Sequence, residues 1–217
     1  MHEEMNSLNN YKTYDLVELP KGKKALKNKW VFKLKKDGDK LVKYKARLVI
    51  KGFSQKQGID FDEIFSLVVK MSSIRVVLGL VASLVLELKQ LDVKTVFLHG
   101  DLKEEIYMDQ LEGFKVKEKE HMVCKLKKSL YGLKQAPRQW YKKFDSFMVG
   151  HGYTRTNADH CVYVRKFLNG KFVILLLYVD DMLIVGQDVG VIGNLKKDLF
   201  KSFDMKDLGP ARQILGM

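Results

Sequence analysis

The sequence has very few cysteines. It contains only Cys124 and Cys161, and neither belongs to a CxxC pair. A disulfide framework and a zinc knuckle both need more cysteines at closer spacing, so the sequence argues against both kinds of site. Each cysteine is therefore expected to be an isolated structural thiol.

The chain also lacks a long hydrophobic run and a readable secretory signal. Its longest uncharged stretch, Val76 to Leu86, is shorter than the roughly 18 apolar residues that a membrane-spanning helix needs. Residues 1–7 carry acids and amides, whereas a signal peptide has a basic start followed by an apolar core. We therefore expect no membrane association and an intracellular, cytoplasmic location.

Acidic residues are outnumbered, and the excess positive charge is concentrated. The 217 residues include 39 Lys and Arg against 26 Asp and Glu, a formal charge of +13, while 46% hydrophobic residues are enough to bury a core. From Lys21 to Lys51 the sequence has 13 basic residues and only two acidic residues, Asp37 and Asp39, which gives a local charge of +11. Such a field favours a polyanionic partner, with nucleic acid as the first candidate. A lysine-rich solubilising face is the alternative.

This basic segment has the alternation of two strands. Apolar and basic residues alternate from Lys29 to Lys35 and again from Val42 to Lys51. Between the two runs, Asp37-Gly38-Asp39 is a turn signal, because glycine tolerates positive φ. We predict a β-hairpin over residues 29–51 with one apolar and one basic face. Its candidate nucleic-acid contacts are Lys29, Lys33, Lys35, Lys43 and Lys51.

The rest of the chain mixes predicted strands and helices. Ser72 or Ser73 can cap a helix that runs through Leu86, and its nearly continuous apolar character predicts deep burial in the core. A predicted strand follows over residues 88–93. The whole pattern predicts an α+β fold in which an antiparallel sheet packs on helices.

Three aspartates carry the chemical argument. Asp180 and Asp181 separate two apolar runs, so the simplest geometry is a hairpin with both acids at its tip. Asp92 ends another predicted strand, and if the strands are neighbours, Asp92 and Asp180 converge. Such oxygen ligands suit Mg²⁺, and two ions held about 3.5–4 Å apart serve in-line phosphoryl transfer. An exposed Asp-Asp turn without metal is the alternative.

At these residues the sequence resembles the reverse transcriptases of copia-type retrotransposons, with the closest likeness to plant elements. The resemblance extends from about Met5 to Met217. Four stretches together carry it: Tyr44–Val49 (YKARLV), Leu91–Leu102 (LDVKTVFLHGDL), Ser129–Trp140 (SLYGLKQAPRQW) and Tyr178–Asp181 (YVDD).

The resemblance implies the fingers and palm of a right-hand polymerase, with the basic β-hairpin in the fingers. Residues 1–90 would be mainly fingers and residues 91–217 mainly palm, with an interleaved fingers segment at about 106–140. A thumb and a ribonuclease H domain are expected to be absent. The implied activity is RNA-directed DNA synthesis from dNTPs on an RNA template and a DNA primer, within a virus-like particle in an intact element.

The resemblance also implies the site residues. Asp92, Asp180 and Asp181 would be catalytic and, with the carbonyl group of Val93, would hold two Mg²⁺ ions, for which Mn²⁺ can substitute. Phe97 resembles the aromatic residue that packs on the sugar and excludes a 2′-hydroxyl group. The implied nucleotide-binding residues are Lys45, Arg47, Phe97, Tyr131 and Gly132. Which of Lys45, Arg47 and Lys51 touches phosphate stays open.

Three positions depart from the family pattern. Leu67 and Leu111 stand where proline is usual, and Val96 stands where alanine is usual. Loss of proline frees a loop in the unfolded state, and a larger side chain at residue 96 adds bulk beside Phe97. Two alternatives to an active polymerase fragment therefore stay open: a non-catalytic nucleic-acid-binding remnant and an inert relic of a degenerate transposon copy.

Overall fold

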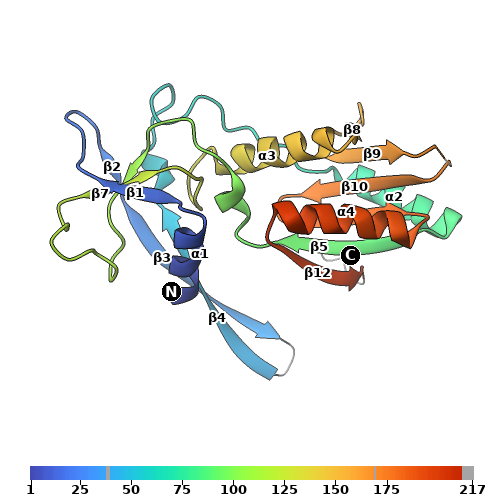
Figure 1. The fold of residues 1–217 in the computed structure, drawn as a ribbon, viewed down its shortest axis with the longest axis horizontal. Coiled ribbons are helices and arrows are strands. Elements are labelled where there is room, and N and C mark those ends of the chain that lie inside the picture. The colour runs from blue at the N-terminus through green and yellow to red at the C-terminus, as the bar shows by residue number, and fades with distance from the viewer. Residues whose placement is uncertain (38–39, 169, 212–217) are drawn as a thin grey trace. The chain divides into compact units, whose positions relative to one another are not determined.

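The computed structural model describes residues 1–37, 40–168 and 170–211 and divides into two compact units. Unit 1 comprises Met1–Phe65 and Phe97–Lys143, and unit 2 comprises Ser66–Val96 and Phe144–Met217. Each unit mixes helices with antiparallel strands, which confirms the predicted α+β class (Figure 1). The expected division into fingers and palm stays a prediction.

Unit 1 is built on a four-stranded sheet and a separate two-stranded ladder. The sheet has the order β1-β7-β6-β2, in which β2 and β6 are parallel and the other pairs are antiparallel. The ladder pairs β3 with β4. The elements are α1 (His2–Asn10), β1 (Tyr14–Val17), β2 (Ala25–Leu26), β3 (Asn28–Asp37), β4 (Lys40–Ile50), η1 (Gly52–Ser54), η2 (Val96–His99), β6 (Tyr107–Met108), β7 (Val123–Leu126) and the first half of α3 (Ala136–Gly150).

The core of unit 1 joins α1 to the end of β4. Met5 and Leu8 of the helix belong to the same buried cluster as Leu48 and Ile50 of the strand. Leu111 is also part of this cluster and is only 2% exposed. The leucine that replaces the expected proline is therefore packed in the core.

The β3–β4 ladder has two chemically different faces. Its register sets Lys33 opposite Lys45 and Phe32 opposite Ala46, so lysines share one face and apolar residues share the other. Part of the apolar face is open to solvent, since Phe32 is 64% exposed and Tyr44 is 77% exposed. The expected turn residues Gly38 and Asp39 lie outside the described residues.

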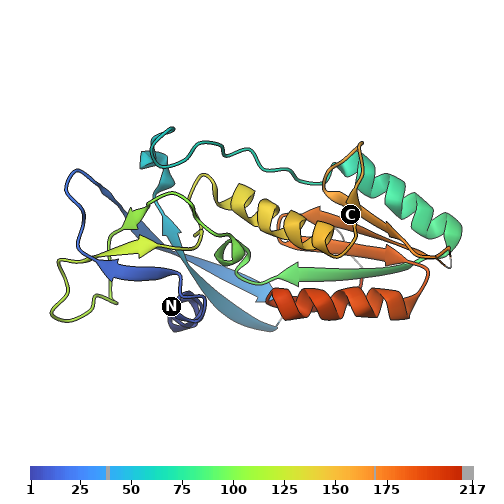
Figure 2. The same cartoon turned by 45° about the horizontal axis from the view of Figure 1, so that its top comes forward.

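Unit 2 is built on a six-stranded antiparallel sheet with the order β12-β5-β11-β10-β9-β8. Figures 1 and 2 show the long strands of this sheet side by side. The elements are α2 (Met71–Leu84), β5 (Glu87–Val93), the second half of α3, β8 (Thr154–Arg155), β9 (Val162–Lys166), β10 (Phe172–Tyr178), β11 (Asp181–Gly186), α4 (Val189–Ser202) and β12 (Met205–Pro210).

Helices α3 and α4 pack on this sheet through small and aromatic residues. Gly186 at the end of β11 lets Ile192 of α4 approach closely, since a Cβ at Gly186 would lie 3.4 Å from that side chain. The ring of Phe144 on α3 lies 5.7 Å from that of Tyr163 on β9 and 5.9 Å from that of Phe203 after α4. The five middle residues of β10, Val173 to Leu177, are buried.

The prediction that the helix after Ser72 is deeply buried is wrong. Of its 14 residues only Ile74 and Val77 are buried, whereas Val76 is 65% exposed and Leu84 is 53% exposed. Two further apolar residues, Leu78 and Val81, are half-buried, and the remaining apolar residues of the helix are exposed. Apolar composition does not reveal how many faces of a helix are covered, and for α2 only one face is.

The start of α2 is also held differently from the prediction. Its N-cap is Lys70, and the Ser73 hydroxyl group donates to Asp159 at 2.7 Å instead of capping the helix. Asp159 also accepts the backbone N–H of Lys70 at 2.8 Å. The start of the helix is therefore held by a carboxylate distant in sequence. No helix in the described part of the chain is long and apolar enough to cross a membrane.

Candidate active site

The three candidate carboxylates gather at one end of the six-stranded sheet. Strands β5 and β11 are neighbours, as the sequence argument required, and their register sets Asp181 opposite Asp92. Asp180 lies one step further, in the two-residue turn between β10 and β11, and its carbonyl group accepts the backbone N–H of Val93 at 2.9 Å. The acids are thus at the hairpin tip, with Asp181 rather than Asp180 directly facing Asp92.

Strand alternation decides which face of the sheet carries the carboxylates. Lys89 of β5 lines a pocket against α4, so residues 89, 91 and 93 face that helix. Gln90 and Asp92 therefore face away from it. Tyr178, Asp181 and Gln90 line a second, very small pocket on this other face, and all three candidate aspartates are half-buried. The acids thus lie on the face opposite α4, where the pocket beside Asp181 is also lined by Ile74 of α2.

The turn that carries Asp180 is strained. Val179 has φ +56°, in the left-handed region, although its side chain is β-branched. A β-branched residue in this region is an outlier that costs on the order of 1–3 kcal/mol. Such strain persists where the surrounding structure over-determines the backbone, and the pairing of β10 with β11 up to Tyr178 and Asp181 does so here. A strained turn between an apolar strand and two acids is typical of a functional site.

The donor set partly fits a divalent cation. Two carboxylates directly opposite each other on neighbouring strands repel, and a cation relieves that repulsion. In the described ranges, however, no group of three or more His, Cys, Asp or Glu side chains is arranged to hold a metal ion. The geometry therefore supports a pair of acidic oxygen donors, Asp92 and Asp181, with Asp180 adjacent.

Unit 1 brings together four of the five residues implied to bind the nucleotide. The guanidinium carbon of Arg47 lies 4.9 Å from the ring centroid of Tyr131, a cation–π distance. The ring of Phe97 meets that of Tyr131 edge-on, with centroids 4.8 Å apart and an interplanar angle of 67°. Gly132 follows Tyr131 directly. An arginine, two aromatic rings and a glycine therefore form one cluster.

The glycine of this cluster has no room for a side chain. Gly132 has φ +91°, and a Cβ there would lie 2.1 Å from the carbonyl oxygen of Ile50. The backbone of β4 and that of the Tyr131–Gly132 turn are in direct contact, and the N–H of Ile50 donates to the Tyr131 carbonyl group at 2.8 Å. Only glycine permits this approach.

The remaining basic candidates lie along the ladder. Lys45 is exposed and shares the face of Arg47, since the two residues are two apart on β4. Lys29 and Lys33 are exposed on β3, Lys51 follows β4 and is half-buried, and Lys35 pairs with Lys43 in the backbone register. The ladder therefore sets several cations on the same face as Arg47.

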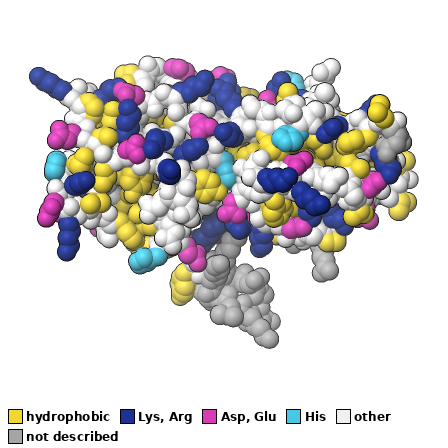
Figure 3. All heavy atoms as spheres, viewed as in Figure 1, with side chains coloured by type: hydrophobic (Ala, Val, Ile, Leu, Met, Phe, Trp, Pro, Cys, Tyr) yellow, Lys and Arg dark blue, Asp and Glu magenta, His cyan; other side chains and the backbone are white. Residues whose placement is uncertain are grey.

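Elsewhere the basic residues are interleaved with acids. Figure 3 shows Lys and Arg side chains scattered among Asp and Glu over the face in view. Many form ion pairs, such as Lys127 with Asp15 at 2.7 Å and Lys128 with Asp101. On the face in view the described basic residues therefore form no continuous cationic surface, and the ladder is the anion-binding candidate with the most closely grouped cations.

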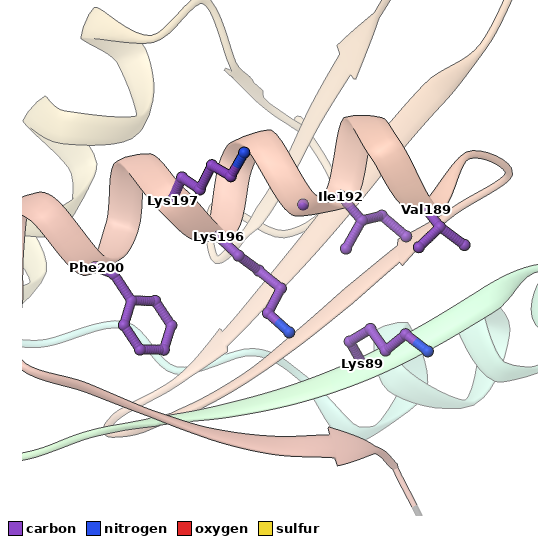
Figure 4. A pocket seen from close by; sticks show the side chains of 7 residues that line it. Lys89, Val189, Ile192, Lys196, Lys197 and Phe200 are labelled. Carbon is purple, nitrogen blue, oxygen red and sulfur yellow. The ribbon is translucent and has the colours of Figure 1, made fainter.

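The pocket that Lys89 lines is larger than the one beside Asp181 and lies away from the acids. It measures about 440 Å³ and is lined by β5 and α4 (Figure 4). Two of the three lysines that line it have acidic partners, because Lys196 pairs with Asp207 and Lys89 pairs with Glu87 at 2.8 Å. The Val189, Ile192 and Phe200 side chains supply the apolar wall. Nothing in this cavity suggests chemistry.

Sequence reasoning missed a buried amide pair beside the cluster. Gln55 is 4% exposed and Gln135 is fully buried, and the Gln55 amide nitrogen donates to the Gln135 side-chain oxygen at 3.1 Å. Gln135 is in the stretch Ser129–Trp140 but received no role, and Gln55 lies in a segment predicted only as a loop. No local pattern identifies Gln55, because its partners lie about 80 residues away.

The chain is similar in sequence to known proteins over its whole length. Residues 11–217 match the family described as "Reverse transcriptase (RNA-dependent DNA polymerase)". The chain is 73% identical over its whole length to the "Retrovirus-related Pol polyprotein from transposon TNT 1-94" of Nicotiana tabacum, of which it covers 16%. It is also 39% identical over its whole length to the transposon RE1 Pol polyprotein of Arabidopsis thaliana, of which it covers 15%.

A more distant relative is the "Transposon Ty1-LR2 Gag-Pol polyprotein" of Saccharomyces cerevisiae, which is 29% identical over 94% of this chain and 11% of that protein. The chain thus spans about a sixth or less of the length of these relatives. The family match over nearly all of the chain, with the aspartates and motif stretches described above, establishes that the chain belongs to the reverse transcriptase (RNA-dependent DNA polymerase) family, as a reverse transcriptase domain of the copia type.

Proposed function

We propose that this chain carries the nucleotidyl-transfer centre of an RNA-directed DNA polymerase, which adds a dNTP to a primer 3′-hydroxyl group on an RNA template. The observation that carries the proposal is the register of β5 and β11, which sets Asp181 opposite Asp92 and leaves Asp180 in the adjoining turn. Family membership supports the same activity.

In this proposal Asp92, Asp180 and Asp181 hold two Mg²⁺ ions together with the carbonyl group of Val93. When bound, the ions supply positive charge to the attacking hydroxyl group and to the leaving pyrophosphate. The chain's own task is to hold the carboxylates in place. The hydrogen bond from the Val93 N–H to the Asp180 carbonyl group ties the strained turn to β5, so the acids stay on adjacent backbones.

The cluster of Arg47, Phe97, Tyr131 and Gly132 is proposed to receive the nucleotide. Lys45 and Arg47 extend from one face of β4 and can contact the triphosphate, because arginine and lysine form charge-assisted hydrogen bonds with phosphate oxygens. Phe97 is proposed to pack on the sugar. Its edge contact with Tyr131 fixes the position of the ring, as a steric test of the 2′-position requires.

The basic face of the β3–β4 ladder is proposed to contact template or primer phosphates through Lys29, Lys33, Lys35, Lys43 and Lys51. Backbone contacts of this kind fix position without reading sequence. Lys33 and Lys45 lie directly opposite each other in the register, so their charges reinforce one another on the same face.

A single-nucleotide extension assay tests the proposed activity. A labelled DNA primer on an RNA template is incubated with one dNTP and Mg²⁺, or Mn²⁺, and wild type is compared with the double variant Asp180→Asn, Asp181→Asn. The matched control is Asp15→Asn, which changes an exposed aspartate on β1. We expect extension by wild type and the control and at least a hundredfold loss in the double variant.

Equal extension by the double variant would rule out the carboxylates as the centre. No extension by wild type, with salt-sensitive template binding retained, would instead identify a nucleic-acid-binding remnant.

A further inference from the structure

The turn that carries Tyr131 and Gly132 contacts the last residue of β4 and the loop that follows this strand at three positions. The first is the hydrogen bond from the Ile50 N–H to the Tyr131 carbonyl group, at 2.8 Å. The second is the contact of two glycine backbones, since a Cβ at Gly52 would lie 1.9 Å from the Gly132 carbonyl oxygen. The third fastening lies three residues further along the chain, at Gln55.

Gln55 uses both ends of its side-chain amide. The oxygen accepts the backbone N–H of Lys134 at 2.9 Å, and the nitrogen donates to the Gln135 side-chain oxygen at 3.1 Å. The Gln55 backbone carbonyl group also accepts the Lys134 ammonium group at 3.2 Å. Because Gln55 is 4% exposed, water cannot readily replace these partners if the side chain is removed.

The buried pair is continued on its far side. The Gln135 amide nitrogen donates to the carbonyl group of Asp60 at 2.9 Å, so the loop after β4 is held at two places. The Lys134 ammonium group lies 4.8 Å from the ring centroid of Phe61, which is itself buried. The loop over residues 52–61 and the turn over residues 131–135 therefore form one hydrogen-bonded unit.

The hydrogen bonds between this loop and this turn help to fix the distance between Arg47 and Tyr131. Arg47 lies on β4 and Tyr131 lies on the turn, so their 4.9 Å stacking distance is kept only while strand and turn stay in register. Fully satisfied buried polar networks make an arrangement more rigid. Gln55 is the loop residue whose side chain reaches the turn at two points, the Lys134 N–H and the Gln135 side chain.

We propose that Gln55 is a positioning residue for nucleotide binding: it holds the Tyr131–Gly132 turn against β4, so that Arg47 and Tyr131 present a preformed surface to the incoming dNTP. This proposal rests on the proposed function of the Arg47 cluster. Gln55 itself is buried and makes no contact with the nucleotide, so its effect is exerted through the turn.

The test replaces Gln55 with methionine, which has nearly the same volume but no hydrogen-bonding amide. The matched control is Gln57→Met, an exposed glutamine in the same loop. In single-nucleotide extension we expect Gln55→Met to raise the KM for dNTP about tenfold with kcat within threefold of wild type. The KM for primer-template and all constants of Gln57→Met should be unchanged.

The split between KM and kcat separates positioning from a merely structural role. A variant that is partly unfolded loses active enzyme, which lowers apparent kcat and leaves KM as it was. An unchanged dNTP KM in Gln55→Met would therefore overturn the proposal. A second comparison uses Arg47→Ala: because both residues act through the same contact, the double variant should raise KM no further than Arg47→Ala alone. Additive effects would also contradict it.

Amide hydrogen exchange tests whether Gln55 holds the turn over residues 131–135, and it does not require an active enzyme. Gln55→Met should speed amide exchange in residues 130–135 and at Ile50, and Gln57→Met should not. If wild type fails to extend primers but exchange rises as expected, the proposed polymerase function fails while the fastening stands. If exchange in the turn is unchanged, Gln55 does not hold it, whatever the activity of the chain.

Discussion

Asp181 on β11 lies directly opposite Asp92 on β5 in the antiparallel register of unit 2. Directly opposed residues of antiparallel strands have Cβ atoms about 4.5–5.5 Å apart, and like charges at that spacing repel. The Asp180 carbonyl group is joined to the next residue of β5, Val93, by a hydrogen bond. The sheet thus sets Asp92 and Asp181 opposite each other, with Asp180 in the adjoining turn, and a bound cation would offset the repulsion of the opposed pair.

The first prediction concerns this repulsion. Without divalent metal, Asp92→Asn should melt at a higher temperature than wild type, because one opposing charge is removed. Adding Mg²⁺ should raise the melting temperature of wild type, because binding to the folded state adds about 2.7 kcal/mol to the unfolding free energy when the Mg²⁺ concentration is a hundred times the Kd. The same addition should have much less effect on Asp92→Asn. Differential scanning calorimetry with and without Mg²⁺ measures both shifts. Equal shifts in the two proteins would contradict a metal site that includes Asp92.

The second prediction concerns the basic ladder. The double variant Lys33→Glu, Lys45→Glu reverses two exposed charges that are directly opposite each other. We expect the salt dependence of primer-template binding to weaken, so that the slope of log K against log salt becomes less negative by about 2. Fluorescence anisotropy over a salt series measures the slope. The control reverses Lys115 and Lys117, exposed residues outside the ladder. A slope that changes equally in both double variants would place the phosphate contacts elsewhere.

The third prediction separates backbone strain from crowding at Gly132. Gly132→Ala introduces a Cβ at φ +91° and 2.1 Å from the Ile50 carbonyl oxygen, so we expect about 3 kcal/mol or more of lost unfolding free energy. Gly22→Ala is the control, because its φ is +82° but no atom lies within 4 Å of the new Cβ. That variant should lose only about 1–2 kcal/mol. Urea unfolding measures both, and similar losses would show that strain alone matters.

The fourth prediction concerns a buried acid of α1. Glu4 is 9% exposed and its carboxylate accepts the Leu48 N–H at 3.4 Å, and desolvation by burial raises the pKa of this group. The folded protein therefore holds the Glu4 proton to a higher pH than the unfolded chain does. Its contribution to stability is fully present below the unfolded pKa of about 4.3 and is lost as the pH rises through the raised folded pKa.

Glu4→Gln removes this titration. We expect the variant to melt above wild type at pH 7, with the difference closing as the pH falls below about 4. Glu3→Gln, at the neighbouring exposed position, should show no such pH-dependent difference. If Glu4→Gln instead melts below wild type at pH 7 and matches it at pH 4, the attraction of the carboxylate to Arg47 and Lys45 outweighs its desolvation.

Several features could be predicted from local patterns alone. The alternation around Asp180 and Asp181 predicted a hairpin with acids at its tip, and the structure confirms this, although Asp181 rather than Asp180 faces Asp92. The period-two alternation of the basic segment predicted two strands, and β3 and β4 pair in antiparallel over these residues, while the role of their basic face stays a prediction. Alternation is a property of the strand itself, so it can be read before any partner is known.

Other features depended on partners distant in the chain. The apolar residues of α2 suggested burial, but only Ile74 and Val77 of the helix are buried. Its first residues are held by Asp159, which is distant in the sequence. The stacking of Arg47 on Tyr131 and the Gln55–Gln135 pair join segments about 80 residues apart.

The sequence by itself therefore determined the family, the strand faces and the identity of the acidic and basic residues. Only the tertiary structure decided which of them meet, because side-chain contacts between distant segments follow from packing, which leaves no periodic trace in the sequence.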